Sequence, residues 1–273
     1  MSLYDEVGYW SEVKLDIVRD YAGAYSTILA AQSNLYHVYI DAFAGAGKHI
    51  SKKTGEPIAG SPLNALLVKP PFREYYFIDI QAEKIEALEV LAAERPNVHV
   101  LHGDCNERLH SDVFPHVRYK DYRRALCLLD PYGLHLDWTV IEEAGQMQSI
   151  DLFLNFPVMD MNRNVLWHNP EGVSEDQKTR MTRFWGDESW RTKAYRPTPT
   201  LFGQDEEKTT NRAVAEAFRT RLREVAGFKR VPEPMPMRNS NGAVVYYLFF
   251  ASNKPVAENI VRDIFAKYEA RGT

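Results

Sequence analysis

The chain has 273 residues, of which 45% are hydrophobic, 12% aromatic and 26% charged, a composition that is typical of a folded domain and too apolar for intrinsic disorder. This length suits one large domain, or one domain with a sizeable insertion, better than two separate cores. The 33 Lys and Arg against 37 Asp and Glu give a net charge of −4, so long-range attraction alone cannot bind a polyanion and any nucleic-acid contact needs a local basic surface.

Cysteine content and the N-terminus indicate the cellular setting. Cys105 and Cys127 are the two cysteines, too few for a disulfide framework, and no Cys or His cluster has the paired spacing of a zinc site. The N-terminus MSLYDEVGYW is acidic where a signal peptide is basic, and no apolar run approaches the ~18 residues of a membrane span. We therefore expect a cytoplasmic protein with no structural metal and no membrane contact.

Patterns of apolar residues predict alternating helices and strands. In chain order these are a helix at 9–31, a strand at 36–42, a helix at 62–68, a strand at 74–80, a helix at 82–94, strands at 98–101 and 125–129, a helix at 138–144, a strand at 151–156, and helices at 212–226 and 255–268. Such alternation implies a parallel sheet with helices on both faces, a Rossmann-like doubly wound α/β fold. A strand pair at 228–237 and 243–251, joined through the turn at 239–242, adds an antiparallel C-terminal edge.

Two segments depart from this alternation. Residues 48–60 are polar and contain glycines and a proline, which predicts a loop. Residues 159–211 are polar and lack a clean period, and we interpret them as an inserted cap or substrate-facing segment. The organisation predicted is thus a single domain over 1–273, with an N-terminal helical segment at 1–35 and the insertion at 159–211.

The ends of the predicted strands hold the candidate site, because ligands of a doubly wound sheet bind beyond the carboxyl ends of its strands. Gly45 and Gly47 follow the first strand and allow a ligand to approach the backbone closely. A P-loop would need glycine at the position of Ala42 and Ser or Thr at that of His49, and a dinucleotide fingerprint would need a third glycine at Ile50. The turn therefore suits a ligand without phosphates.

Acidic residues end the next strands. Asp79 is placed to accept hydrogen bonds from the two hydroxyls of a ribose, and Asp104 from an adenine amino group. Either carboxylate could instead serve only as the cap of a following helix. The sequence from Asp130 to Gly133 follows the fourth strand. It is either a loop that carries reactive groups or a plain turn, the second because Asp, Pro and Gly all favour turns.

Two basic stretches are candidates for contacts with other molecules. Residues 118–124 mix cations and aromatics at the end of the sheet away from the strand-end site, which favours a solvated face or a partner contact. Within the insertion, the residues placed either to hold a nucleic-acid strand or, for the tryptophans, to form a structural core are Arg163, Lys178, Arg180, Arg183, Trp167 and Trp185.

Taken together, these motifs resemble those of class I S-adenosylmethionine-dependent methyltransferases. The matching motifs are Tyr39-Ile-Asp-Ala-Phe-Ala-Gly-Ala-Gly47, the acid Asp79, Gly103-Asp104-Cys105 and Leu129-Asp-Pro-Tyr132. More narrowly, Tyr9-Trp-Ser-Glu-Val-Lys-Leu15, Gly60-Ser-Pro62 and Leu129-Asp-Pro-Tyr-Gly-Leu134 are similar to the three-Cys-motif partner family, methyltransferase-like proteins found beside a protein with three clustered cysteines.

The resemblance implies S-adenosylmethionine as cofactor and assigns roles to particular residues. The implied cofactor-binding residues are Asp41, Phe43, Gly45, Gly47, Asp79, Ile80, Asp104 and Cys105. Asp130 and the Pro131 carbonyl would accept hydrogen bonds from an exocyclic amine, and Tyr132 would stack on the base. The implied activity is methylation of an amino group on a DNA or RNA base.

Two alternatives remain open. The chain could be a noncatalytic nucleoside- or cofactor-binding partner of a three-Cys-motif radical or iron–sulfur protein, as the family association suggests. A Mg²⁺ site for phosphoryl chemistry could use the four strand-end acids Asp41, Asp79, Asp104 and Asp130, since carboxylates suit that ion. Four separate strand ends, however, span too much of the sheet edge to converge easily on one ion.

Overall fold

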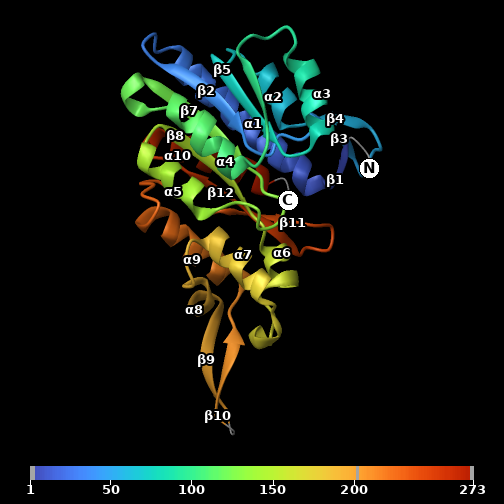
Figure 1. Ribbon diagram of the computed structural model, residues 1–273, viewed down its shortest axis with the longest axis vertical. Helices are drawn as coiled ribbons and strands as arrows, with labels where there is room; N and C mark the ends of the chain where they lie inside the picture. The colour runs from blue at the N-terminus through green and yellow to red at the C-terminus, as the bar shows by residue number, and fades with distance from the viewer. Residues whose placement is uncertain (1–3, 201–202, 271–273) are drawn as a thin grey trace.

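The computed structural model describes residues 4–200 and 203–270, built around a seven-stranded sheet in the order β11-β12-β8-β7-β2-β5-β6 (Figure 1). The strands are β2 (Tyr36–Asp41), β5 (Glu74–Asp79), β6 (Val98–His102), β7 (Arg123–Leu129), β8 (Ile150–Phe156), β11 (Met235–Arg238) and β12 (Val244–Ala251). β6, β5, β2, β7 and β8 run parallel, while β12 runs antiparallel to β8 and β11 antiparallel to β12. The predicted fold class, a mostly parallel doubly wound α/β sheet, is confirmed.

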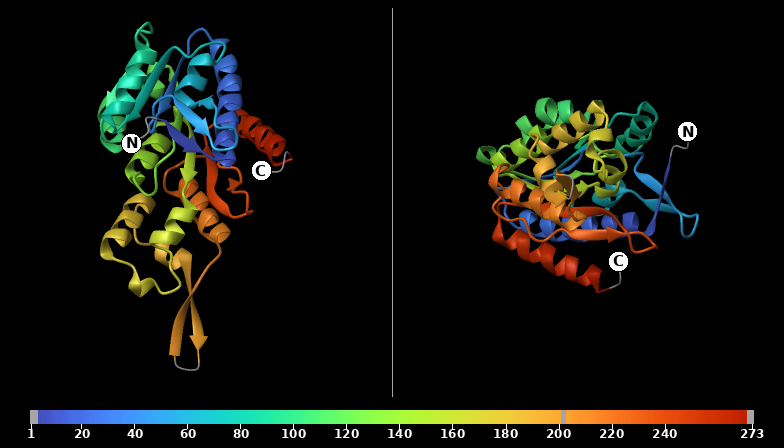
Figure 2. Two further views of the ribbon diagram at one scale, coloured as in Figure 1. Left: turned by 90° about the vertical axis from the view of Figure 1, so that its right-hand side faces the viewer. Right: turned by 90° about the horizontal axis from the view of Figure 1, so that it is seen from below.

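Helices cover both faces of the sheet. One face packs against α1 (Tyr9–Ala30), α2 (Ser61–Leu67), α3 (Ala82–Ala92) and α10 (Pro255–Glu269), and the other against α4 (Cys105–Arg108), α5 (Trp138–Met147) and α9 (Asn211–Glu224). Along β2, Val38 and Ile40 face the second layer while Tyr39 faces the first, and all three are buried. Burial on both faces explains why the strands are continuous apolar runs. α1 and α10 pack side by side although they lie near opposite ends of the sequence (Figure 2).

The segment 48–60, predicted as a loop, forms strands instead. β3 (Lys48–Ser51) and β4 (Pro57–Ala59) pair with each other, and β1 (Asp5–Val7) adds to β3 in parallel. Strands of three or four residues are too short to show an alternating pattern, and β1 lies more than forty positions from its partner along the chain. The loop prediction was therefore wrong because the strands are too short to show a pattern and because one of the two pairings, that of β1 with β3, is non-local.

The insertion is also more regular than its sequence indicates. It contains α6 (Val158–Asn164), α7 (Glu175–Trp185), α8 (Trp190–Ala194) and a projecting hairpin of β9 (Tyr195–Thr200) and β10 (Gly203–Lys208) (Figure 1). Residues 201–202 of the insertion, and the chain ends 1–3 and 271–273 of the predicted single domain, lie outside the described residues.

The tryptophans of the insertion divide between core and surface. Trp185 and Trp190 are buried, and their indole N–H groups donate to the hydroxyls of Ser189 and Thr182, both at 3.0 Å. Trp167 is 42% exposed. Of the two alternatives for Trp185, a structural core is the one observed.

The predicted strand at 228–237 is shorter than expected. Only residues from Met235 onward belong to β11, and the preceding stretch contains Pro232 and Pro234. Proline cannot donate to a strand ladder, which explains the late start. Of the helices in the described part of the chain, none combines the length and the apolar character that crossing a membrane would require.

A backbone contact between two glycines sets the start of α2. The Gly60 amide donates to the Gly47 carbonyl at 2.9 Å, and a Cβ atom on Gly60 would lie 2.9 Å from both the carbon and the oxygen of that carbonyl. No side chain fits there, so glycine is required by close approach rather than by an unusual φ. The contact holds Ser61, the first residue of α2, against the turn that follows β2.

We predict that Gly60→Ala destabilises the protein by about 1–3 kcal/mol, the usual cost of overpacking, because the new Cβ must push the two backbones apart. Gly23→Ala is the matched control, since a Cβ on that residue of α1 meets nothing within 4 Å and removal of glycine stabilises a helix by roughly 0.5–1 kcal/mol. Urea unfolding of both variants measures these changes. Equal stability of Gly60→Ala and the unmodified protein would show that the contact does not constrain α2.

Candidate functional site

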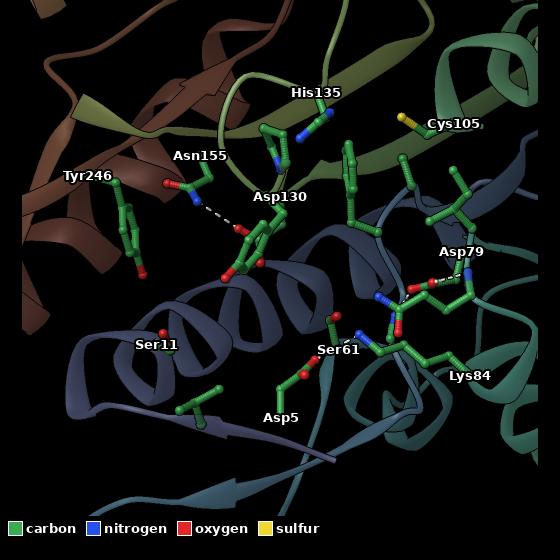
Figure 3. A pocket seen from close by; sticks show the side chains of 18 of the residues that line it. Asp5, Ser11, Ser61, Asp79, Lys84, Cys105, Asp130, His135, Asn155 and Tyr246 are labelled. Carbon is green, nitrogen blue, oxygen red and sulfur yellow. Dashed lines mark hydrogen bonds and ion pairs between the residues drawn. The ribbon is translucent and has the colours of Figure 1, made fainter. Parts of the chain in front are cut away.

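A cavity of about 860 Å³ lies beyond the carboxyl ends of the parallel strands, a size typical of ligand sites (Figure 3). The chain leaves β2 toward β5 on one side and reaches β7 on the other, so the cavity lies at the topological switch point of the sheet. The predicted site residues that line it are Phe43, Gly45, Asp79, Ile80, Asp104, Cys105, Asp130, Pro131 and Tyr132. Four separate strand ends therefore contribute to one cavity.

Asp79 ties the turn after β2 to the end of β5. Its Oδ2 accepts a hydrogen bond from the Gly45 amide at 2.9 Å, and its Oδ1 accepts one from the Gln81 amide at 2.9 Å. Gly45 has φ +62°, a left-handed conformation that favours glycine, and a Cβ there would meet only His49 at 3.9 Å. Each carboxylate oxygen has a second lone pair, so Asp79 can shape this turn and still accept hydrogen bonds from a ligand in the cavity.

Asp104 caps a helix and also lines the cavity. Its Oδ1 accepts hydrogen bonds from the Asn106 amide at 2.8 Å and from Asn106 Nδ2 at 2.9 Å, which caps α4. Asp104 also lines the cavity beside Cys105. Burial, together with the carboxylates of Asp104 and Asp137, raises the pKa of the Cys105 thiol to about 12. The sulfur is therefore protonated near neutral pH and packs rather than attacks.

An exposed apolar side chain, that of Ile80, also lines the cavity. Ile80 follows β5 directly and is 66% exposed, although it lines a cavity whose other wall includes the half-buried Phe43. Exposed apolar surface inside a concave site is typical of a surface that a ligand covers.

Two predicted residues do not line the cavity. Asp41 is fully buried at the end of β2, and Gly47 faces α3, where an added Cβ would lie 2.5 Å from Leu91. Burial raises the pKa of the Asp41 carboxyl to about 7, and the negative charge of Asp130 adds to this effect. Both residues therefore pack beneath the cavity lining and do not face its interior.

A buried ion pair joins α1 to the loop after β7. Lys14, only 6% exposed, forms a salt bridge with Asp130 Oδ2. Asn155 Nδ2 donates to Asp130 Oδ1 at 2.9 Å (Figure 3). The Lys14 ammonium also lies 5.6 Å from the centre of the Tyr246 ring, within cation–π range. A buried lysine is stable only with such compensation, so Asp130 and Lys14 fix each other. Lys14 lies within the motif from Tyr9 to Leu15, but its pairing with a residue 116 positions away has no sequence signal.

The next two residues of the loop after β7 differ in their exposure. Pro131 is buried, whereas Tyr132 is 90% exposed at the cavity wall. Among the described residues, none donates a hydrogen bond to the Pro131 carbonyl. An exposed aromatic ring and an available carbonyl thus flank the Asp130 carboxylate.

Ion pairs that the sequence did not predict border the cavity. Lys84 on α3 pairs with Asp5 of β1 at 2.9 Å, which closes one side (Figure 3). On the other side, α7 of the insertion contributes Arg180, which contacts His135 Nε2 at 2.9 Å, and Arg183, which pairs with Asp137 at 2.7 Å.

Only some of the residues predicted to hold a nucleic-acid strand lie at the cavity. Arg180 and Arg183 line the cavity, while Lys178 pairs with Glu175 at 2.8 Å on α7 and Trp185 is buried. Arg163 is exposed on α6 and does not line the cavity.

The four acids considered for Mg²⁺ are not arranged as ligands. Asp41 lies behind the wall, Asp79 accepts two backbone hydrogen bonds and Asp130 is paired with Lys14. Across residues 4–200 and 203–270, no group of three or more His, Cys, Asp or Glu residues is placed to hold a metal ion.

Comparison with known structures supports the fold. A crystal structure of protein LPL1258 from Legionella pneumophila, family-model DUF519, is similar with a TM-score of 0.56 and 13% identity, covering 95% of this chain and 94% of that one. A candidate methyltransferase from Thermobifida fusca has a TM-score of 0.45 and 17% identity over 89% of this chain and 79% of that one. An S-adenosylmethionine-dependent methyltransferase from Clostridium acetobutylicum has a TM-score of 0.41 and 9% identity over 87% and 91%.

The likeness to the Legionella protein extends over nearly the whole of both chains and shows a common fold. No protein-family model matches the chain, and no curated protein matches it in sequence. The narrower resemblance to the three-Cys-motif partner family therefore stays a prediction.

We predict that Asp41→Asn changes how stability depends on pH. The folded-state pKa of Asp41, about 7, lies above the value of about 3.9 for an unfolded chain. The ionised carboxylate therefore destabilises the folded state at high pH, and this destabilisation decreases as the pH falls through 7 toward 4. The unfolding free energy of Asp41→Asn relative to the unmodified protein should be higher at pH 8 than at pH 5 by roughly 2–3 kcal/mol.

Urea unfolding at the two pH values measures this difference, with Asp263→Asn on the exposed side of α10 as control. The control should shift stability equally at both values. The same equal shift in Asp41→Asn would contradict the raised pKa.

Proposed function

We propose that the protein is an S-adenosylmethionine-dependent methyltransferase that modifies an exocyclic amino group of a nucleic-acid base. The observation that carries the proposal is the cavity at the switch point, where six of the eight residues predicted for the cofactor lie together with Asp130, Pro131 and Tyr132. Neither region alone would support it, because strand-end acids and Asp-Pro turns are both common.

The residues near β2, β5 and β6 fit the nucleoside part of the cofactor. Asp79 offers carboxylate lone pairs to ribose hydroxyls, and Asp104 offers an acceptor to an adenine amino group. Ile80 supplies an exposed apolar surface for the flat face of a base. The turn at Gly45 has no phosphate-binding pattern, in agreement with a cofactor that lacks phosphates.

Methyl transfer from a sulfonium needs orientation and desolvation more than a strong base. S-adenosylmethionine, when bound, supplies the electrophilic methyl group. The protein must then hold the acceptor amine so that its lone pair points at that methyl carbon. Hydrogen bonds from the amine to acceptors on one side achieve this orientation.

Asp130 and Pro131 provide those acceptors. The Asp130 carboxylate has about four lone-pair sites, of which Lys14 and Asn155 occupy two, and the Pro131 carbonyl is available. Lys14, itself buried, balances the carboxylate charge and holds Asp130 in one orientation for the incoming amine. Lys14 thus acts as a positioning residue through Asp130.

The cavity edge suits a base that is presented from a nucleic-acid strand. Tyr132 offers an exposed ring on which a base can stack, and Arg180 and Arg183 lie at the same edge as cations for the phosphate backbone. This local charge is needed because the chain as a whole carries −4.

Two features favour the noncatalytic alternative, a cofactor-binding partner of a three-Cys-motif protein. Both Asp130 oxygens already have protein partners, and Tyr132 makes little contact with the rest of the chain. A binding module would need no more than this. The distinction rests on whether methyl groups are transferred.

We predict that S-adenosylhomocysteine binds with one site per chain and that Ile80→Ala weakens it about 5- to 30-fold, the effect of losing one to two kcal/mol of apolar burial. Val90→Ala is the matched control, because Val90 is 77% exposed on α3 and does not line the cavity. Calorimetry measures both affinities. Absence of binding, or equal loss in both variants, would remove the cofactor assignment.

We predict that the protein transfers labelled methyl groups from S-adenosylmethionine to RNA or single-stranded DNA, and that Tyr132→Ala lowers kcat/KM about 5- to 150-fold by removing 1–3 kcal/mol of stacking. Tyr132→Phe keeps the ring and should retain most activity. Because Tyr132 is 90% exposed, neither change should affect folding. Cofactor binding without transfer to either nucleic acid, or to protein, would replace the catalytic proposal by the noncatalytic one.

A further inference from the structure

A second cavity, of about 610 Å³, lies at the opposite edge of the sheet, where β7 and β8 begin. Its walls come from the C-terminal half of α1, the basic stretch 118–124, the starts of both strands and the first turns of α10. It shares no lining residue with the first cavity. The basic stretch, which the proposed function does not use, therefore borders a concave site.

The mouth of this cavity is apolar and aromatic. Ile28, Tyr119, Tyr122 and Val256 line it and are 37%, 42%, 60% and 52% exposed. Large apolar side chains gathered around one cavity, from three separate segments, are typical of a surface that binds a partner or ligand. A ligand with a ring would cover them.

Two cations flank the Tyr119 ring at the same mouth. The Arg124 guanidinium carbon lies 3.6 Å and the Lys254 ammonium 5.1 Å from the ring centre. A hydrogen bond from Lys254 and the charges of Lys254 and Arg124 lower the pKa of Tyr119. Arg124 Nη1 donates to two backbone carbonyls, and Lys254 contacts the Tyr119 hydroxyl at 3.4 Å. Both cations keep donors for an anion.

The interior of the cavity carries an unpartnered hydroxyl. Ser149 is 3% exposed, and its Oγ has no hydrogen-bond partner in the part of the chain that the structure describes. Leaving a buried polar group unsatisfied costs about 1–3 kcal/mol, so a ligand that bonds to it recovers this energy.

The acid that lines this cavity is buried and already has two hydrogen-bond donors. Asp151 accepts hydrogen bonds from Tyr21 at 2.7 Å and from Ser252 at 2.5 Å. Burial raises the pKa of Asp151, which favours its neutral form. The charge presented at the mouth is therefore that of Arg124 and Lys254, with Lys120 beside them.

We propose that the second cavity binds a small aromatic anion, whose ring packs among the tyrosines while its phosphate or carboxylate contacts Lys254 and Arg124. A volume of about 610 Å³ accommodates a molecule of this kind. The proposal for this site does not rest on the proposed methyl transfer or on its cofactor.

Phenyl phosphate is the ligand that tests this proposal. Inorganic phosphate, which has the anion without the ring, and benzyl alcohol, which has the ring without the anion, are the comparison ligands. In a ¹H–¹⁵N NMR titration, phenyl phosphate should shift the amide signals of Tyr25, Arg124 and Ser149 and bind at least 10-fold more tightly than either comparison ligand. Lys254→Met should weaken phenyl phosphate about 10-fold. Lys267→Met, the same change at the far end of α10, should alter it less than 2-fold.

Ser149→Ala provides a second variant that does not remove charge. It should weaken phenyl phosphate several-fold, yet leave the free protein at least as stable in urea, because Oγ has no partner to lose. No amide shifts, shifts confined to the first cavity, or an affinity that Lys254→Met leaves unchanged would each overturn the proposal.

Discussion

The hydrogen bond from the Gly45 amide to Asp79 is the constraint on which the site depends. β2 and β5 are neighbours in the sheet, and the turn that leaves β2 must bend over the end of β5 for a cavity to form. The carboxylate that makes this bond also lines the cavity. The shape of the turn and the ligand recognition proposed above therefore rest on one side chain.

A second constraint acts across the layers. α1 precedes the sheet in the chain, yet its Lys14 is buried against the loop after β7 and balances Asp130. A helix that packs on one face of the sheet thus completes a site formed at the strand ends. The insertion does the same from the other side, since α7 brings Arg180 and Arg183 to His135 and Asp137. The cavity is a meeting point of segments that are remote in sequence.

Residues with local signals were predictable, and those with only long-range partners were not. The apolar runs of β2, β5 and β7 and the acids that end them follow from strand burial and sheet topology, so Asp79, Asp104 and Asp130 could be expected at one edge. Strands β1, β3 and β4 escaped prediction because they are short and because β3 also pairs with the distant β1. Lys14 and Lys84 look like ordinary helix-surface cations until the fold shows their acidic partners.

α1 forms part of the wall of both cavities, with Lys14 at one and Tyr21 and Tyr25 at the other. These residues are rigidly spaced along 22 residues of one helix. An occupant of one cavity that displaced this helix would therefore also displace a wall of the other cavity. Thermodynamic linkage then requires reciprocity: whatever factor one occupant imposes on the affinity of the other is returned unchanged.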